Sequence, residues 1–277
     1  MKQPKPGIYK MSMDEYKSID AVNNSTLVRA SKTLAHVQAQ KKETRVMSFG
    51  QAFHSYLLEN HLFKRDYAII PYNLKLTKKA GKAWLKDHGD KNIVKSDDAI
   101  TMANMASSLY SGNYETARNL VEKSEKEISV IWRHKKEGVL CKARFDLLSR
   151  KLGIIADVKT STNANPDKWL RMMVNAGIQP FFQPFWYLEG CKSIPELSHI
   201  KTFLWVVIEA DPPYGISIIK ATPVPDGKPS MVYASGLKIA SILQKYIQAK
   251  NTNKWVGYPD KIIDLKLEEW MFKKLEI

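Results

Sequence analysis

Cysteine, long apolar runs and acidic residues are scarce in this chain, and each shortage excludes a class of protein. Only Cys141 and Cys191 occur among 277 residues, so neither a disulfide framework nor a zinc knuckle is predicted. No stretch approaches the roughly 20 apolar residues of a membrane helix. The N-terminal MKQPKPGIYK lacks the apolar core of a signal peptide. We therefore expect a cytoplasmic protein with reduced thiols and no membrane association.

The balance of charges is strongly basic. Lys and Arg number 43 against 28 Asp and Glu, which gives a net charge of +15. This excess favours a polyanionic partner, nucleic acid before membrane, although a protein that is merely basic remains the alternative. Lysines concentrate between residues 73 and 95, at Lys75, Lys78, Lys79, Lys82, Lys86, Lys91 and Lys95. Such a run is typical either of a solvated helix face or of a surface that contacts phosphates.

No Gly- or Ser-rich linker, internal repeat or low-complexity run divides the chain. We expect one mixed α/β domain over residues 1–277, with a helical part of about 1–125 packed on a core of about 126–277. Residues 1–22 are expected to be extended. Strands are predicted at 127–132, 200–209 and 214–221, and helices at 23–40, after a capping box at 48–51, from 96, at 113–123, 166–177 and 229–250.

The stretch from Gly138 to Thr160 predicts a β-hairpin, because apolar and polar residues alternate along both of its arms. If the chain turns about the Lys151–Leu152 bond, Asp146 lies opposite Asp157. One register then puts both carboxylates on one face and all their apolar neighbours on the other. The same register pairs Arg144 with Lys159 and Phe145 with Val158.

Opposed carboxylates in such a hairpin lie about 5 Å apart at Cβ. They repel each other unless one binds a proton or a cation lies between them. A hard divalent cation with oxygen ligands, Mg²⁺ or Mn²⁺, would remove the conflict. The alternative is an ordinary hairpin whose polar face is simply solvated.

Asp157 and Lys159 are two residues apart on the predicted strand and therefore share a face. The carboxylate can bind a metal ion while the ammonium orients a water molecule or stabilises charge on a phosphate. D-x-K alone occurs by chance in many proteins. With Asp146 in register and a basic chain around it, the pattern favours metal-dependent hydrolysis of phosphodiesters.

Two helical segments supply further candidates. His54 lies on the flank of the helix predicted after Ser48, where a packed or solvated histidine is the alternative to a ligand. Gln183 and Tyr187 are four residues apart and share a helix face if their segment is helical. Pro184 disfavours that helix, because it cannot donate a backbone hydrogen bond.

Together these motifs resemble the PD-(D/E)xK nuclease superfamily, in the branch with an added helical histidine typified by the RecB nuclease domain. The closer resemblance is to the exodeoxyribonuclease VIII (RecE) nuclease domain and its prophage-encoded relatives. The likeness runs nearly end to end. It is carried by Gly7-Ile8-Tyr9, Asn23 to Leu27, Phe49 to His54 with Leu58-Glu59, Glu127 to Trp132, Gly138 to Asp146, Asp157 to Thr160, and Gln183 with Tyr187.

The resemblance implies a role for each matching position. His54, Asp146 and Asp157 would bind Mg²⁺ together with the backbone carbonyl of Val158, with Mn²⁺ as a substitute. Lys159 would be the catalytic lysine. The remaining positions would support the site or hold DNA: Glu127, Gln183 and Tyr187, with Arg144 on a phosphate. One departure is Pro180, which stands where the family often has an aromatic residue, three positions before the glutamine.

The resemblance further implies a restriction-endonuclease-like core, a central mixed sheet flanked by helices. It implies processive digestion of double-stranded DNA from its ends, 5′ to 3′, which leaves 3′ single strands for a RecT-like annealing protein. It also implies a toroidal homo-oligomer around DNA. Two alternatives stay open: a catalytically silent nucleic-acid-binding protein of the same fold, and a structure-specific endonuclease.

Overall fold

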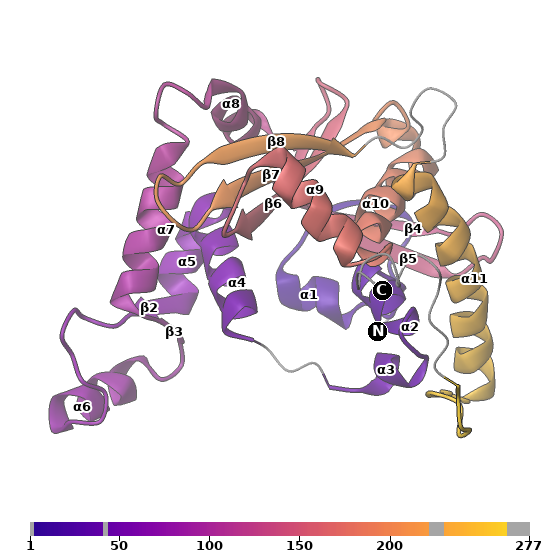
Figure 1. Cartoon of the computed structure of the whole chain (residues 1–277), viewed down its shortest axis with the longest axis horizontal. Helices are drawn as coiled ribbons and strands as arrows, with labels where there is room; N and C mark the ends of the chain where they lie inside the picture. The colour runs from indigo at the N-terminus through magenta and orange to yellow at the C-terminus, as the bar shows by residue number, and fades with distance from the viewer. Residues whose placement is uncertain (1–2, 41–43, 222–229, 265–277) are drawn as a thin grey trace, which may run out of the picture.

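The computed structural model describes residues 3–40, 44–221 and 230–264. Its centre is a six-stranded sheet in the order β1-β4-β5-β6-β7-β8 (Figure 1). The strands are β1 (Gly7–Lys10), β4 (Glu125–Arg133), β5 (Leu140–Ser149), β6 (Ile154–Ser161), β7 (Thr202–Glu209) and β8 (Ile216–Ala221). β6 and β7 run parallel and the other neighbours antiparallel. The expected mixed sheet is confirmed.

Helices cover both faces of this sheet. The first face packs against α2 (Asn24–Ala30), α9 (Pro166–Asn175), α10 (Phe182–Ser193) and α11 (Met231–Thr252). The second packs against α4 (Arg45–Leu58), α5 (Asn60–Asp66), α7 (Ser96–Ser108) and α8 (Glu115–Lys123). Figure 1 shows α10 and α11 on the right and α4, α5 and α7 on the left. Every residue of β5 is buried, as is usual for a strand with both faces covered.

Full burial corrects one expectation about the hairpin. Its apolar residues do not share a single face opposite the acids. Phe145 and Ile155 belong to the first hydrophobic cluster, whereas Ala156 and Val158 belong to the second. Lys142, Arg144, Asp146 and Asp157 are therefore enclosed by helices and not solvated.

Three helix boundaries differ from the sequence predictions. Residues 1–22 are not extended throughout, because Ser12 and Glu15 form a capping box that starts α1 (Met13–Ser18). The helix predicted over 23–40 is interrupted after Ala30 and resumes as α3 (Ala35–Gln38). α4 begins before the predicted capping box, because the side chain of Thr44 accepts a hydrogen bond from the Met47 amide.

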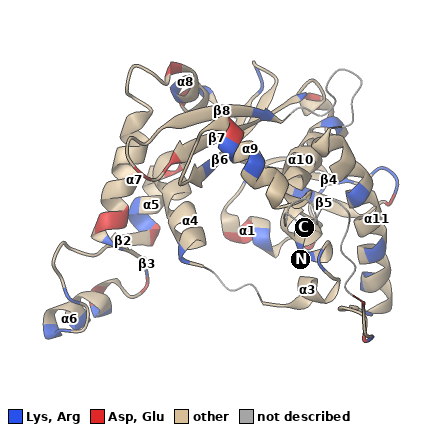
Figure 2. Cartoon of the chain, in the orientation of Figure 1, with Lys and Arg blue, Asp and Glu red and all other residues tan. Residues whose placement is uncertain are grey.

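A small lysine-rich unit extends from the body at the lower left of Figure 1. It consists of α6 (Lys79–His88) between the parallel strands β2 (Tyr67–Ile69) and β3 (Asn92–Val94). Six of its lysines are exposed and form no ion pair within the described ranges: Lys75, Lys78, Lys79, Lys82, Lys86 and Lys95. Figure 2 shows the basic residues on α6. Of the helices in the described residues, none combines the length and apolarity needed to span a membrane.

Candidate active site

The hairpin register is confirmed next to the turn. Leu147 pairs with Ala156, Leu148 with Ile155 and Ser149 with Ile154, as a turn about the Lys151–Leu152 bond requires. The ladder then stops, so the pairs expected for Arg144 and Phe145 are not formed. β6 continues in parallel beside β7, where Asp157 pairs with Trp205. The two strands therefore split at Asp146 and Asp157.

Asp146 bridges this split with its side chain. Its Oδ2 accepts a hydrogen bond of 2.8 Å from the Val158 amide. A side chain thus replaces the missing backbone ladder, and the Asp146 carboxylate is fixed beside β6. The split leaves space between the strands into which functional groups from other elements can point.

Glu127 enters the split from β4. Its φ is +56°, a left-handed conformation that is uncommon for a residue with a side chain and costs on the order of 1 kcal/mol or more. The pairs on either side, Lys126 with Leu147 and Ile128 with Phe145, are formed, so the irregularity is confined to Glu127 and the facing Asp146. The sequence carries no signal for this backbone conformation.

His54 reaches the split from α4. Its Nε2 lies 2.7 Å from the Val158 carbonyl oxygen, and its Nδ1 lies 3.4 Å from Asp146 Oδ2. Burial is the largest influence and lowers the pKa of His54, so the neutral imidazole is favoured. A neutral ring donates from only one nitrogen, and therefore the other nitrogen faces an oxygen lone pair. A cation among these atoms would relieve that repulsion.

His54, Glu127 and Asp146 form a possible metal cluster, with one ligand atom from each lying within 4.8 Å of the other two. Burial, followed by the charges of Asp157 and Glu127, raises the pKa of Asp146 well above its usual value. A buried carboxylate that resists ionisation is stabilised as an anion by a divalent cation. Carboxylate oxygens with one imidazole suit Mg²⁺ or Mn²⁺, so the residues fit the expected group.

Lys159 and Gln183 surround Asp157. Lys159 Nζ lies 2.5 Å from Asp157 Oδ2, while the Gln183 side chain donates to Asp157 Oδ1 at 2.5 Å. Lys159 also donates to Gln183 Oε1 at 3.3 Å. Burial lowers the pKa of Lys159, but the charges of Asp157 and Asp146 outweigh it, and the net shift is upward. Lys159 is therefore a fixed ammonium ion.

Gln183 and Tyr187 share a helix, as expected from their spacing. α10 begins at Phe182, so Pro184 falls in its first turn, where a missing N–H costs nothing. The ring of Tyr187 packs between Phe145, at 5.1 Å, and Phe203, at 6.0 Å. Burial and the neighbouring Asp157 raise the pKa of Tyr187 well above its usual value, which keeps its hydroxyl neutral.

Arg144 is buried in a network of its own. Its Nε pairs with Glu127 Oε2 at 2.5 Å, and one terminal nitrogen donates to the Met11 carbonyl at 2.7 Å. The other terminal nitrogen lies 3.7 Å from Glu59, which also pairs with Lys10 at 3.2 Å. Arg144 therefore fixes Glu127 in this structure, and its contact with a phosphate stays a prediction. The bridging position of Glu59 was not predicted, although its place at the end of α4 offered a hint.

An enclosed split in a mixed sheet, holding three acids, a lysine and a glutamine, defines a PD-(D/E)xK-like protein. The chain belongs to the family described as "PDDEXK-like domain of unknown function (DUF3799)", whose model matches residues 12–266. A comparison with curated proteins finds no match.

One solved structure has the same fold. The crystal structure of a protein named "Putative exonuclease" from Eubacterium rectale matches with a TM-score of 0.58 and 12% identity. The match covers 96% of this chain and 98% of that one. The crystal structure of SSO0001 matches with a TM-score of 0.31 and 15% identity, covering 73% of this chain and 87% of that one. The second score is too low to carry an argument, and the first supports the fold alone.

Proposed function

We propose that this chain is a Mg²⁺-dependent exodeoxyribonuclease that digests linear double-stranded DNA from its ends. The observation that carries the proposal is the meeting of Asp146, Asp157 and Lys159 at the strand split, with His54 beside them. Membership of the PDDEXK-like family supports a nuclease, and the name of the Eubacterium rectale protein supports exonuclease activity.

In this proposal His54, Asp146, Asp157 and the Val158 carbonyl would hold the metal ion, as the resemblance implies. The cluster of ligand atoms in the structure contains His54 and Asp146 with Glu127 and not Asp157, so Glu127 is a further candidate ligand. A divalent cation supplies an activated water molecule and neutralises charge on the scissile phosphate. The chain itself supplies the fixed ammonium of Lys159, which donates hydrogen bonds to that water or to a phosphate oxygen. Gln183 restrains both Lys159 and Asp157, and therefore sets the distance between them.

The DNA end, the 5′ to 3′ direction and the release of 3′ single strands for an annealing protein rest on the resemblance to RecE-type nucleases. The toroidal homo-oligomer rests on the same resemblance. A single nuclease domain over 1–277 and a cytoplasmic location rest on the lack of a linker, on the two isolated cysteines and on the N-terminal sequence, and they are part of the proposal. The exposed lysines of 75–95 and the charge of +15 support contact with DNA phosphates.

The decisive experiment compares Lys159→Ala with wild type on linear and covalently closed duplexes, in Mg²⁺, in Mn²⁺ and after chelation. Wild type should degrade the linear duplex but not the covalently closed one, and only when a divalent metal ion is present. Lys159→Ala should bind DNA and hydrolyse at least about 100-fold more slowly, since one lost transition-state donor costs about that much. Lys192→Ala, which removes an exposed lysine from the far end of α10, is the matched control.

Each alternative has its own outcome. Cleavage of closed circles would indicate an endonuclease. Salt-sensitive binding without metal-dependent degradation would indicate a silent binding protein. Near wild-type degradation by Lys159→Ala would overturn the assignment of the site.

A further inference from the structure

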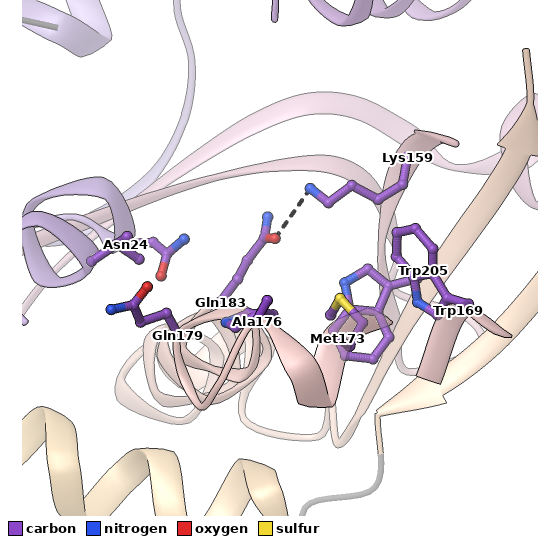
Figure 3. Close-up of a pocket in the computed structure, with 10 residues that line it drawn as sticks. Asn24, Lys159, Trp169, Met173, Ala176, Gln179, Gln183 and Trp205 are labelled. Atoms are coloured by element: carbon purple, nitrogen blue, oxygen red, sulfur yellow. Dashed lines mark hydrogen bonds between the residues drawn. The ribbon is translucent and has the colours of Figure 1, made fainter. Parts of the chain in front are cut away.

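A hollow of about 310 Å³ opens beside the candidate active site. Lys159 and Gln183 lie on its wall, so it is continuous with the split that holds Asp157. Its volume is at the lower end of the range for small-molecule sites. Figure 3 shows Asn24 and Gln179 on one side of the hollow and Trp169, Met173 and Trp205 on the other.

The aromatic side of the hollow is rigid and apolar. Trp169 is 5% exposed, Met173 8% and Trp205 3%. Trp205 is held by edge contacts with Phe181, at 6.1 Å, and Phe203, at 5.4 Å. With so little of each ring exposed, Trp169 and Trp205 offer a planar ligand edge contacts and no free face.

The hollow also collects unsatisfied polar atoms. Three buried side-chain atoms of its lining have no hydrogen-bond partner among the described residues: Asn24 Oδ1, Trp169 Nε1 and Trp205 Nε1. Buried indole N–H groups usually find an acceptor, so such a concentration requires an explanation. These two donors and one acceptor are buried within residues that line an apolar wall, and they suit a planar ligand with acceptors and donors on its edge.

The charges around the hollow limit the class of ligand that it can bind. Lys159 is the one charged residue among the described residues that line the hollow, and it already pairs with Asp157. A phosphate or a carboxylate would find no second cation here. If a neutral heterocycle occupies the hollow, the backbone phosphate attached to it lies on the Lys159 side, toward the acids.

We propose that this hollow binds the nucleobase of an unpaired nucleotide at the DNA end. The inference rests on the proposed function, and it names the part of the substrate that the site recognises beyond the scissile phosphate. A base inside a duplex is stacked and paired, so it must be unpaired to enter. The terminal base pair is thus opened before its phosphate reaches Asp157 and Lys159.

The test uses duplexes with 5-iododeoxyuridine either at the 5′ end or ten pairs inside, with Ca²⁺ in place of Mg²⁺ to limit hydrolysis. Irradiation should cross-link the terminal base to peptides containing residues 169–173 or Trp205. Ala176→Trp fills the mouth of the hollow from an exposed position at the end of α9 and should reduce this cross-link at least tenfold. Asn175→Trp, which adds the same bulk outside the lining, should leave it unchanged.

The rate of hydrolysis provides a second test. A mismatched terminal pair should release the first nucleotide faster, on the order of tenfold, which corresponds to the roughly 1.4 kcal/mol of one stacking step. Ala176→Trp should reduce that rate. A chain that degrades linear DNA but cross-links elsewhere, or equally in both Trp variants, would overturn the base site and leave the nuclease intact. A chain that cross-links in the hollow without any metal-dependent hydrolysis would overturn the nuclease alone, and failure of both readings would overturn both.

Discussion

Asp146→Asn should stabilise the metal-free protein while abolishing hydrolysis. The Asp146 and Glu127 carboxylates have oxygens within 4.8 Å of each other. At an effective dielectric constant of about 20, two charges at that distance repel by about 3.5 kcal/mol. Arg144 offsets part of this by pairing with Glu127, and asparagine weakens the bond from the Val158 amide by about 1 kcal/mol. The net gain is therefore about 1–2 kcal/mol near neutral pH.

The pH dependence follows from the raised pKa of Asp146. The contribution of this carboxyl group to stability is fully present below its unfolded value of about 3.8 and is lost as the pH rises through the folded value. The gain from Asp146→Asn should therefore vanish in acid and grow toward neutral pH. Thermal melting detects it, since 1 kcal/mol corresponds to about 2–4 °C in proteins of roughly this size.

Metal titration completes the experiment. Mg²⁺ or Mn²⁺ at about 100 times its dissociation constant should stabilise wild type by about 2.7 kcal/mol and the Asn variant by much less. Glu125→Gln removes an exposed acid of the neighbouring strand β4 that pairs with Arg150, and this variant should gain nothing without metal and respond to metal as wild type does. An Asp146→Asn protein that melts below wild type without metal, or keeps the full metal response, would refute the reasoning.

Three further predictions follow from other parts of the molecule. Changing Lys79, Lys82 and Lys86 together to Glu should weaken DNA binding measured by fluorescence anisotropy. The slope of log affinity against log salt concentration should become shallower by about 2–3. An unchanged slope would exclude α6 from the interface. Lys142→Met should lower the free energy of unfolding in urea by about 1–3 kcal/mol, because Lys142 Nζ donates to the carbonyls of Tyr16, Lys17 and Ile19. Burial lowers the pKa of Lys142 to about 8, so the contribution of Lys142 to stability should rise as the pH increases from about 8 to about 10.5. The Met variant should lack this rise. The Mg²⁺ concentration for half-maximal hydrolysis should fall as the pH rises toward the raised pKa of Asp146, because the proton must leave before the metal binds; a half-maximal concentration independent of pH would contradict this.

Strand alternation predicted the hairpin well because the side chains of a strand repeat every two residues. That period placed Asp146 across from Asp157 and predicted the pairing next to the turn. It could not predict where the ladder ends, because that depends on a side chain. The Asp146 carboxylate accepts the Val158 amide in place of a backbone partner from β5.

Local sequence patterns predicted the wrong start of a helix where neighbouring residues favoured two different backbone structures. Pro4, Pro6 and Gly7 favour an extended entry, yet the later capping box of Ser12 and Glu15 starts a helix. Ser48 has a plausible capping pattern, but Thr44 caps the helix one turn earlier. The hollow beside Lys159 was not predicted at all, since Asn24, Trp169 and Trp205 come from separate elements that only the fold brings together.

The left-handed Glu127 is best explained by the same split that separates β5 from β6. A regular β4 would pair Glu127 with Asp146 through the backbone, because the pairs on either side of them are formed. The positive φ removes this one pair without disturbing its neighbours. Arg144, on the adjacent strand, then holds the displaced carboxylate at 2.5 Å. The strained backbone of Glu127 and the buried ion pair with Arg144 thus act together to keep the Glu127 carboxylate beside Asp146, although the two carboxylates repel each other. This arrangement stabilises the fold poorly by itself, and it becomes favourable once a cation lies between the acids.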